Sequence, residues 1–258
     1  MAIRDHEFFR RFEEEVKALR ARASFWQCVF PFSRKGREVA KFVREDLPRM
    51  EEQVEELRSV PDRFNHLFRQ YGWIASEYMN FEAMKRAVQI AEDEGIDEAE
   101  QFLEDHWNSN ENIEFWLRRL CFNPLVSKRY KLLSLALKDH NAERFHASVP
   151  VVLAQIDGIV FDLTKKSFFE RGRKRTKHLR AKESVVADPS GLAALADGLS
   201  DPRSATDQGP VSLAYRHGIF HGEDLGYANR RTSTKAFAAL LSLAPWVEKT
   251  QGGGQPSS

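Results

Sequence analysis

The chain is organised around one short stretch, which reads Tyr215-Arg216-His217-Gly218-Ile219-Phe220-His221-Gly222. This stretch places a permanent cation and two imidazoles close together, with apolar side chains between them and a glycine directly after them. The long apolar segment that follows, Lys235 to Val247, is typical of a helix that packs beside the stretch. A helical core can therefore hold this backbone while its polar groups remain available for chemistry.

The segments on the N-terminal side of this stretch also predict helices. Residues 5–22 carry apolar side chains at helical spacing, and residues 37–58 form a heavily charged amphipathic segment in which Pro48 predicts a kink or an end. Pro61 is expected to open a third helix, because proline fits the first helical turn. No segment shows the alternation typical of a strand, so we predict an all-α protein.

A residue that precedes a proline is disfavoured in the helical conformation, and Asn123-Pro124 therefore predicts a domain boundary. We expect a helical N-terminal domain over residues 1–122 and a second helical domain over residues 123–249. A basic and then Gly-, Ala-, Pro- and Ser-rich insertion is expected over residues 165–210 of the second domain. Residues 250–258 read as a flexible tail.

The composition limits the location and the partners of the protein. The 258 residues carry a formal net charge of +1, so any attraction to nucleic acid must be local. The charged N-terminus has no signal-peptide core, and two isolated cysteines fit a reducing compartment. The most apolar run, Val149 to Phe161, is too short to span a bilayer and carries Gln155 and Asp157. We expect a soluble cytoplasmic protein that is not bound to a membrane.

The residue types in the central stretch suit the cleavage of RNA. Cleavage through the 2′-OH needs a base that takes the hydroxyl proton and an acid that protonates the leaving oxygen, and histidine can serve in either role. Arginine stays charged and offers donors that match phosphate oxygens. The spacing alone is a weak pattern, because Arg173 and His178 repeat it inside the basic segment without an apolar face.

The stretch from Tyr215 to Gly222 resembles the signature of the HEPN superfamily, in which an arginine and a polar residue are followed by a histidine and often a glycine. A second match is Ser148 to Val160, which is similar to the first core helix of a bacterial HEPN-like subgroup, where an acidic residue interrupts an apolar helix. Asn229 and the Leu240-Leu241 segment also fit. The resemblance covers roughly residues 123–247, without the insertion.

The resemblance implies a bundle of four or five helices that forms a homodimer, in which two copies of the motif meet in one cleft. It also implies RNA cleavage without a metal or another cofactor, leaving a cyclic phosphate, with Arg216 as the phosphate clamp and His221 as the general acid and base. Proteins of this kind often act as toxins or antiviral defence effectors, so an antitoxin or a sensor protein is a further partner to expect.

Arg216 and His221 would lie about 140° apart on an ideal helix and would not share a face. Either the helix ends near Gly218, or the two groups work from different protomers. His217 and His221 also have the spacing of a helical zinc pair, with Asp224 as a third ligand, but no glutamate lies between them. We therefore expect no metal site and expect His217 to position the substrate or to pack.

Asp157 interrupts an apolar helix and needs a partner there. It could orient Arg216 or His221 through a salt bridge, or it could pair with Arg129 or Arg144.

The basic segment from Lys165 to Lys182 allows two interpretations: it contacts the RNA backbone, or it is a solvated loop. Its candidate RNA-binding residues are Arg171, Arg173, Lys174, Arg175 and Lys177.

The alternative to a ribonuclease is a degenerate, non-catalytic HEPN-like module that binds RNA or a protein. A separate alternative is purely structural: Arg216 caps a carbonyl or pairs with Asp157, while His221 merely ends a helix.

Overall fold

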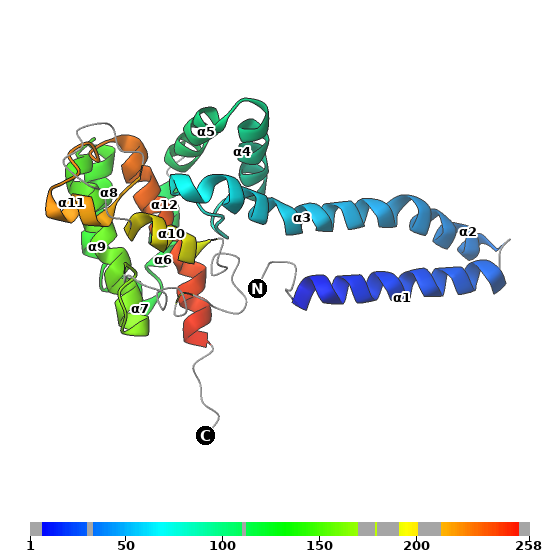
Figure 1. Cartoon of the computed structure of the whole chain (residues 1–258). Helices are drawn as coiled ribbons and strands as arrows, with labels where there is room; N and C mark the ends of the chain where they lie inside the picture. Colours follow the sequence, from blue (N-terminus) through cyan, green and yellow to red (C-terminus); the bar gives the residue numbers. More distant parts are fainter. Residues whose placement is uncertain are drawn as a thin grey trace, which may run out of the picture. The chain divides into compact units, whose positions relative to one another are not determined.

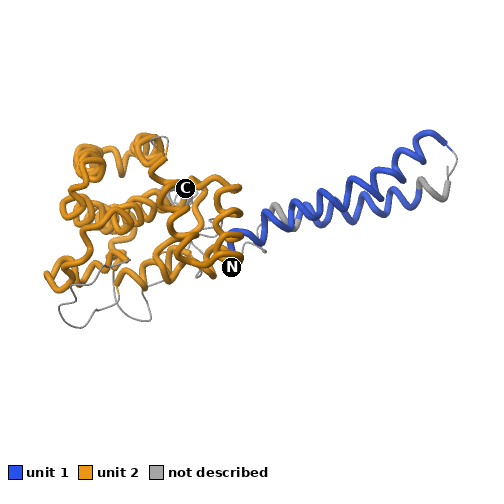
Figure 2. Tube along the Cα trace, turned by 90° about the horizontal axis from the view of Figure 1, so that it is seen from above, with its two compact units in different colours: residues 1–62 blue, residues 63–258 orange. Residues whose placement is uncertain are grey.

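A computed structural model describes residues 7–29, 33–109, 112–169, 179, 191–200 and 213–252. These residues are mostly α-helical and contain no β-strand, so the predicted all-α class is confirmed (Figure 1). The chain divides into two compact units, Met1–Asp62 and Arg63–Ser258, and the boundary falls inside helix α3 (Figure 2).

Unit 1 is a helical hairpin. Its elements are α1 (Glu7–Val29), α2 (Arg34–Lys41), the π-helix η2 (Phe42–Asp46) and the first part of α3 (Leu47–Phe68). Ser33 caps α2 by accepting a hydrogen bond from the Gly36 N–H at 2.9 Å, which satisfies a helix-end donor. Ion pairs between Arg20 and Glu51 (2.7 Å) and between Arg58 and Glu13 (2.9 Å) show that α1 and α3 run antiparallel.

Unit 2 is a helical bundle around α12. Its elements are η3 (Arg69–Tyr71), α4 (Phe81–Asp93), α5 (Ile96–Asn108), α6 (Asn112–Leu120), α7 (Pro124–Ser127), α8 (Tyr130–Asn141), α9 (Phe145–Thr164), α10 (Leu192–Ser200), α11 (Arg216–His221) and α12 (Arg230–Gly252). Helix α12 packs against α9, α5, α6 and α10, while α8 packs against α9. The largest fully buried side chains of unit 2 include Trp73, Trp107, Trp246, Phe168 and Phe237.

The structure does not separate residues 1–122 from residues 123–249. Asn123 does begin a new helix, because its side chain accepts from the Leu125 N–H at 3.0 Å and Pro124 occupies the first turn of α7. Helices α5 and α6, which precede this position, nevertheless pack against α12 within the same unit. The proline therefore changes the direction of the chain inside one core, and the division between units lies after Asp62 instead.

Helix α9 extends beyond the apolar run 149–161 at both ends. Its full length and its composition would be sufficient to cross a membrane, which holds for no other helix in the described part of the chain. Length and composition alone do not distinguish such a helix from the core helix of a bundle. Val149, Val152, Leu153 and Ile156 are completely buried, and α8 and α12 pack against the helix.

Candidate functional site

Helix α11 consists of the Arg216–His221 part of the central stretch. The residue before it, Tyr215, is extended, and its carbonyl oxygen accepts the first helical hydrogen bond, from Ile219 N at 3.0 Å. The helix ends at Gly222, where φ is +72°, a left-handed conformation that side chains with a Cβ atom rarely adopt. The glycine after His221 therefore ends the helix directly behind the second imidazole.

Gly218 lets the chain fold back onto this short helix. The N–H groups of Glu223 and Asp224 both donate to the Gly218 carbonyl oxygen, at 2.8 and 3.1 Å. A Cβ atom on Gly218 would lie only 2.9 Å from the Cβ atom of Asp224, which is closer than such atoms approach one another. Glycine is thus required because the returning chain occupies the space that a side chain would need.

The functional side chains of α11 fall on two faces. The rings of His217 and His221 lie together, with centroids 4.3 Å apart. The guanidinium of Arg216 lies over the ring of Phe220 at 5.3 Å, and also over Phe169 at 5.8 Å. The His217–His221 pair and the Arg216–Phe220 pair are each four residues apart, the spacing that brings side chains together on a helix. The helix does not end near Gly218, so Arg216 and His221 lie on different faces of one chain.

Arg216 lines a cavity of about 290 Å³ that lies against α9. The other lining residues are Leu153, Ala154, Asp157, Gly158, Phe161, Phe169 and Phe220. The structure therefore brings together two of the four predicted site residues, Arg216 and Asp157. His217 and His221 do not line this cavity, and the His221 side chain is exposed.

Asp157 makes its hydrogen bonds with the segment that follows α9. One carboxylate oxygen accepts from the Ser167 hydroxyl at 2.6 Å and from the Phe168 N–H at 2.7 Å. These bonds fold the turn that carries Phe169 over the cavity. Among the described residues, the carboxylate thus stabilises the cavity wall and makes no ion pair with Arg216.

The alternative partners expected for Asp157 are wrong. Arg129 instead donates to Asp162 at 2.7 Å and to Gln155 at 2.9 Å. Arg144 pairs with Asp139, at 2.6 Å.

The remaining predictions concern a metal site and the residues that would bind RNA. In the part of the chain that the structure describes, no group of three or more His, Cys, Asp or Glu side chains could hold a metal ion. Asp224, the third ligand considered for a zinc site, is buried beside Gly218. The basic residues Arg171, Arg173, Lys174, Arg175 and Lys177 lie outside the described residues, so their role as RNA contacts stays a prediction.

The aromatic wall of the cavity is the feature that the sequence interpretation did not assign. The spacing of Arg216 and Phe220 signals that these two side chains share a face. In the sequence, Phe169 is visible only as one of two adjacent phenylalanines, Phe168 and Phe169. Nothing in the sequence indicates that Phe161, which is half exposed, faces the same space.

A buried polar cluster around His140 was also missed. The His140 Nδ1 atom lies 2.8 Å from Ser233 Oγ, and its Nε2 atom lies 2.7 Å from Asn108 Oδ1. Ser233 Oγ also lies 2.7 Å from Ser148 Oγ. Burial, assisted by the positive charge of Arg230, lowers the pKa of His140 to about 4. The cluster joins α5, α8, α9 and α12 and lies away from the cavity lining.

Comparison with known protein families, with curated proteins and with solved structures finds no match for this chain.

Proposed function

We propose that this protein is a metal-independent endoribonuclease of the HEPN type, in which Arg216 binds the scissile phosphate. The observation that carries the proposal is the position of the Arg216 guanidinium, which lines an open cavity and lies over the rings of Phe169 and Phe220. This arrangement suits a strand of RNA, because guanidinium matches phosphate oxygens and an aromatic ring offers a stacking surface for a base.

The proposed reaction is attack of the 2′-OH on the adjacent phosphorus. A neutral imidazole takes the hydroxyl proton, the bond to the 5′-oxygen breaks, and a protonated imidazole returns a proton to that oxygen. His221 performs this proton transfer, and His217, whose ring lies beside it, holds it in position. Arg216 stabilises the negative charge that gathers on the phosphate oxygens. The products are a 2′,3′-cyclic phosphate and a free 5′-hydroxyl.

The proposed active form is a homodimer, because Arg216 and His221 lie on different faces of α11. Two copies that meet at this helix combine the Arg216 side chain of one protomer with the His221 side chain of the other. The basic segment 171–177 would add contacts to the RNA backbone that weaken with salt. We propose a cytoplasmic toxin or antiviral defence effector, held in check by an antitoxin or a sensor protein.

The second candidate is a non-catalytic module that binds RNA or a protein. The observation in its favour is that His221 is exposed and does not line the cavity of its own chain. In this case Arg216 and the aromatic residues would bind a ligand without cleaving it.

The test is RNA cleavage in EDTA by the wild type and by the Arg216→Ala and His221→Ala variants. We expect each substitution to lower the rate by at least about 100-fold, since each removes a group that acts in the transition state. His66→Ala is the matched control, because His66 is an exposed histidine on another helix. Cyclic-phosphate ends identify the reaction.

Mixing the two inactive variants tests the composite site. Mixed dimers retain an intact Arg216 on one protomer and an intact His221 on the other, so part of the activity should return. RNA that binds to the wild type without being cleaved would favour the second candidate, and activity that requires added metal would contradict the proposed mechanism.

A further inference from the structure

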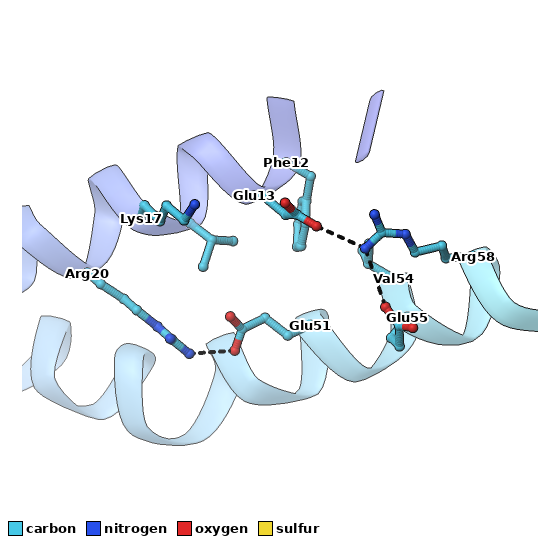
Figure 3. A pocket seen from close by; sticks show the side chains of 9 residues that line it. Phe12, Glu13, Lys17, Arg20, Glu51, Val54, Glu55 and Arg58 are labelled. Carbon is cyan, nitrogen blue, oxygen red and sulfur yellow. Dashed lines mark hydrogen bonds and ion pairs between the residues drawn. The ribbon is translucent and has the colours of Figure 1, made fainter. Parts of the chain in front are cut away.

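The hairpin of unit 1 leaves several large apolar side chains partly exposed. Among the described residues of unit 1, few apolar side chains of α1 and α3 are buried, and a cavity of about 250 Å³ lies in the seam between these helices (Figure 3). Leu19, Met50 and Leu57 are 39%, 42% and 44% exposed. Because a helical hairpin gains most of its stability from packing an apolar face, these three residues indicate a missing partner.

Three of the exposed apolar residues of unit 1, Leu19, Met50 and Leu57, lie on one face of the hairpin, whereas Phe25, which is 63% exposed, projects from the side of α1 away from the seam. On α1, Glu13, Val16 and Arg20 line the seam, and successive residues turn by about 100° on a helix. Leu19, which is seven residues or about two turns after Phe12, therefore lies to one side of the seam, and Phe12 lies between Leu19 and the seam.

The corresponding positions on α3 have the same pattern. Glu51, Val54 and Arg58 line the seam, and Met50 and Leu57 take the places that Phe12 and Leu19 take on α1. Since the two helices are antiparallel, side chains displaced in the same rotational sense project from the same face. The set Phe12, Leu19, Met50 and Leu57 is called the hairpin face below.

The charges beside the hairpin face match a second copy of the same hairpin. On α1, the exposed Glu15 and Arg22 flank Leu19 on the outer side. If α1 packs against α1 of another copy in antiparallel fashion, each Glu15 lies opposite an Arg22. The same symmetry axis must also serve α3, where antiparallel packing would bring each Met50 opposite a Leu57.

The register of the hairpin makes these two pairings compatible. The Arg20–Glu51 and Glu13–Arg58 ion pairs fix which residues of α1 and α3 lie level with each other. In this register, the midpoint between Met50 and Leu57 falls within about one residue, or roughly 1.5 Å, of the midpoint between Glu15 and Arg22. One two-fold axis across the hairpin therefore satisfies both helices at once.

The other face-to-face arrangement places like charges together. If α1 packed against α3 of the second copy, the same register would bring Glu15 level with Glu56 and Arg22 level with Arg49. Like charges in such positions oppose association and exclude the wrong pairing. The sequence of the hairpin thus favours one isologous arrangement.

We propose that the hairpin face docks on the hairpin face of a second copy of this chain, with α1 against α1 and α3 against α3, to form an antiparallel four-helix bundle. The contact is formed by unit 1 alone and does not depend on the proposed ribonuclease activity. Its occupant is a second copy because the Met50–Leu57 pair of α3 and the reciprocal Glu15–Arg22 charges of α1 share one axis.

Sedimentation of the full-length chain at micromolar concentration tests the contact. We expect Leu19→Glu to weaken the hairpin contact by at least about 100-fold, and so to lower the mass of the assembly relative to the wild type at the same concentration, since two carboxylates would be buried in the bundle. Ala21→Glu is the matched control, because Ala21 is exposed on α1 on the other side of the seam. It should leave the dimer unchanged. A monomeric wild type, or an assembly whose mass and affinity are the same with and without Leu19→Glu, would overturn the proposal, whereas a residual dimer in Leu19→Glu is the species that the α11 contact would leave.

A charge exchange keeps the test decisive if Leu19→Glu disturbs the fold. Glu15→Arg should weaken the dimer about 10-fold by placing two arginines opposite each other at both ends of the contact. The double variant Glu15→Arg/Arg22→Glu should restore the wild-type affinity, because the reciprocal pairs form again. Failure of this rescue would overturn the pairing of α1 with α1. RNA cleavage measured alongside reports separately on the proposed function.

Discussion

At the scale of single residues, His140 shows how a buried polar group is kept neutral. The Asn108 side-chain N–H groups donate to Glu104 O at 2.7 Å and to Thr234 Oγ1 at 2.8 Å, which leaves Asn108 Oδ1 as an acceptor. His140 Nε2 therefore carries the hydrogen, and Nδ1 accepts from the Ser233 hydroxyl. A second proton would have to go on Nδ1, which already accepts a hydrogen bond from the Ser233 hydroxyl, and the resulting charge would be buried. The neutral form of His140 is therefore favoured.

This cluster predicts how stability depends on pH. The pKa of His140 is about 4 in the folded protein and about 6.5 when unfolded, so between these values the unfolded chain binds more protons. Stability should therefore fall as the pH drops from about 6.5 to 4, by up to about 3 kcal/mol from this residue. Urea unfolding across this range measures the effect.

His140→Gln is the informative variant for the pH dependence. Glutamine keeps a donor and an acceptor but does not titrate, so the slope between pH 6.5 and 4 should become shallower. An unchanged slope would show that other groups cause the pH dependence.

At the scale of elements, α11 depends on its glycines more than on its length. A helix of six residues cannot be stable alone, because helix formation has a costly nucleus. It is held by contacts with α9 and α10, by the left-handed Gly222 and by the chain that folds back over Gly218. The direction of the Arg216 side chain is therefore a property of the packing around α11.

Two glycine substitutions should have opposite effects on stability. Gly218→Ala should destabilise unit 2 by about 1–3 kcal/mol, since the new Cβ atom overlaps Asp224 and forces the backbone to shift. Gly198→Ala in α10 should stabilise it by about 0.5–1 kcal/mol, because the nearest atom to its Cβ would be a Leu213 methyl group at an ordinary 3.8 Å. Chemical unfolding of both variants compares them directly, and equal effects would contradict this account.

Helix α3 corrects an expectation based on local sequence. Pro61 was expected to open a new helix, but α3 continues through it from Leu47 to Phe68. Proline removes one helical hydrogen bond, which the surrounding structure must offset. Val60, Pro61 and Phe64 are buried, so packing holds the helix together at this point.

At the scale of the whole molecule, a buried ion cluster connects the early and late parts of unit 2. Lys235 on α12 forms an ion pair with Glu100 on α5, and the two side chains are only 2% and 3% exposed. Trp73 Nε1 also donates to Glu100, at 2.9 Å, and Arg231 donates to Glu104 at 3.0 Å. Burial lowers the pKa of Lys235, while the charge of Glu100 opposes this change.

Removing one partner of this pair should be more harmful than replacing both. Lys235→Met should cost about 3–5 kcal/mol, because it leaves the Glu100 charge buried without its main partner. Lys235→Met/Glu100→Gln should recover much of the loss, since the neutral amide can still accept from Trp73. Denaturant unfolding measures both variants.

An exposed lysine is the control for this pair. Lys138→Met should change the unfolding free energy by less than about 0.5 kcal/mol, because Lys138 lies on the surface of α8. If Lys235→Met behaved like this control, the buried pair would make no net contribution to stability.

The sequence by itself determined the properties that depend on short-range chemistry. Helical periodicity established the all-α class. The spacing of Arg216 and His221 also indicated that they would lie on different faces. These features depend on residues a few positions apart, so the local pattern was sufficient.

Only the tertiary structure decided which distant segments meet. It placed Arg216 and Asp157 in the lining of one cavity with an aromatic wall, paired Glu100 with Lys235, and moved the division of the chain from residue 122 to Asp62. Each of these outcomes depends on packing between helices that are far apart in the chain. The sequence pattern shows that a helix has an apolar face, whereas the shapes and volumes of all the faces together select the partner of each one.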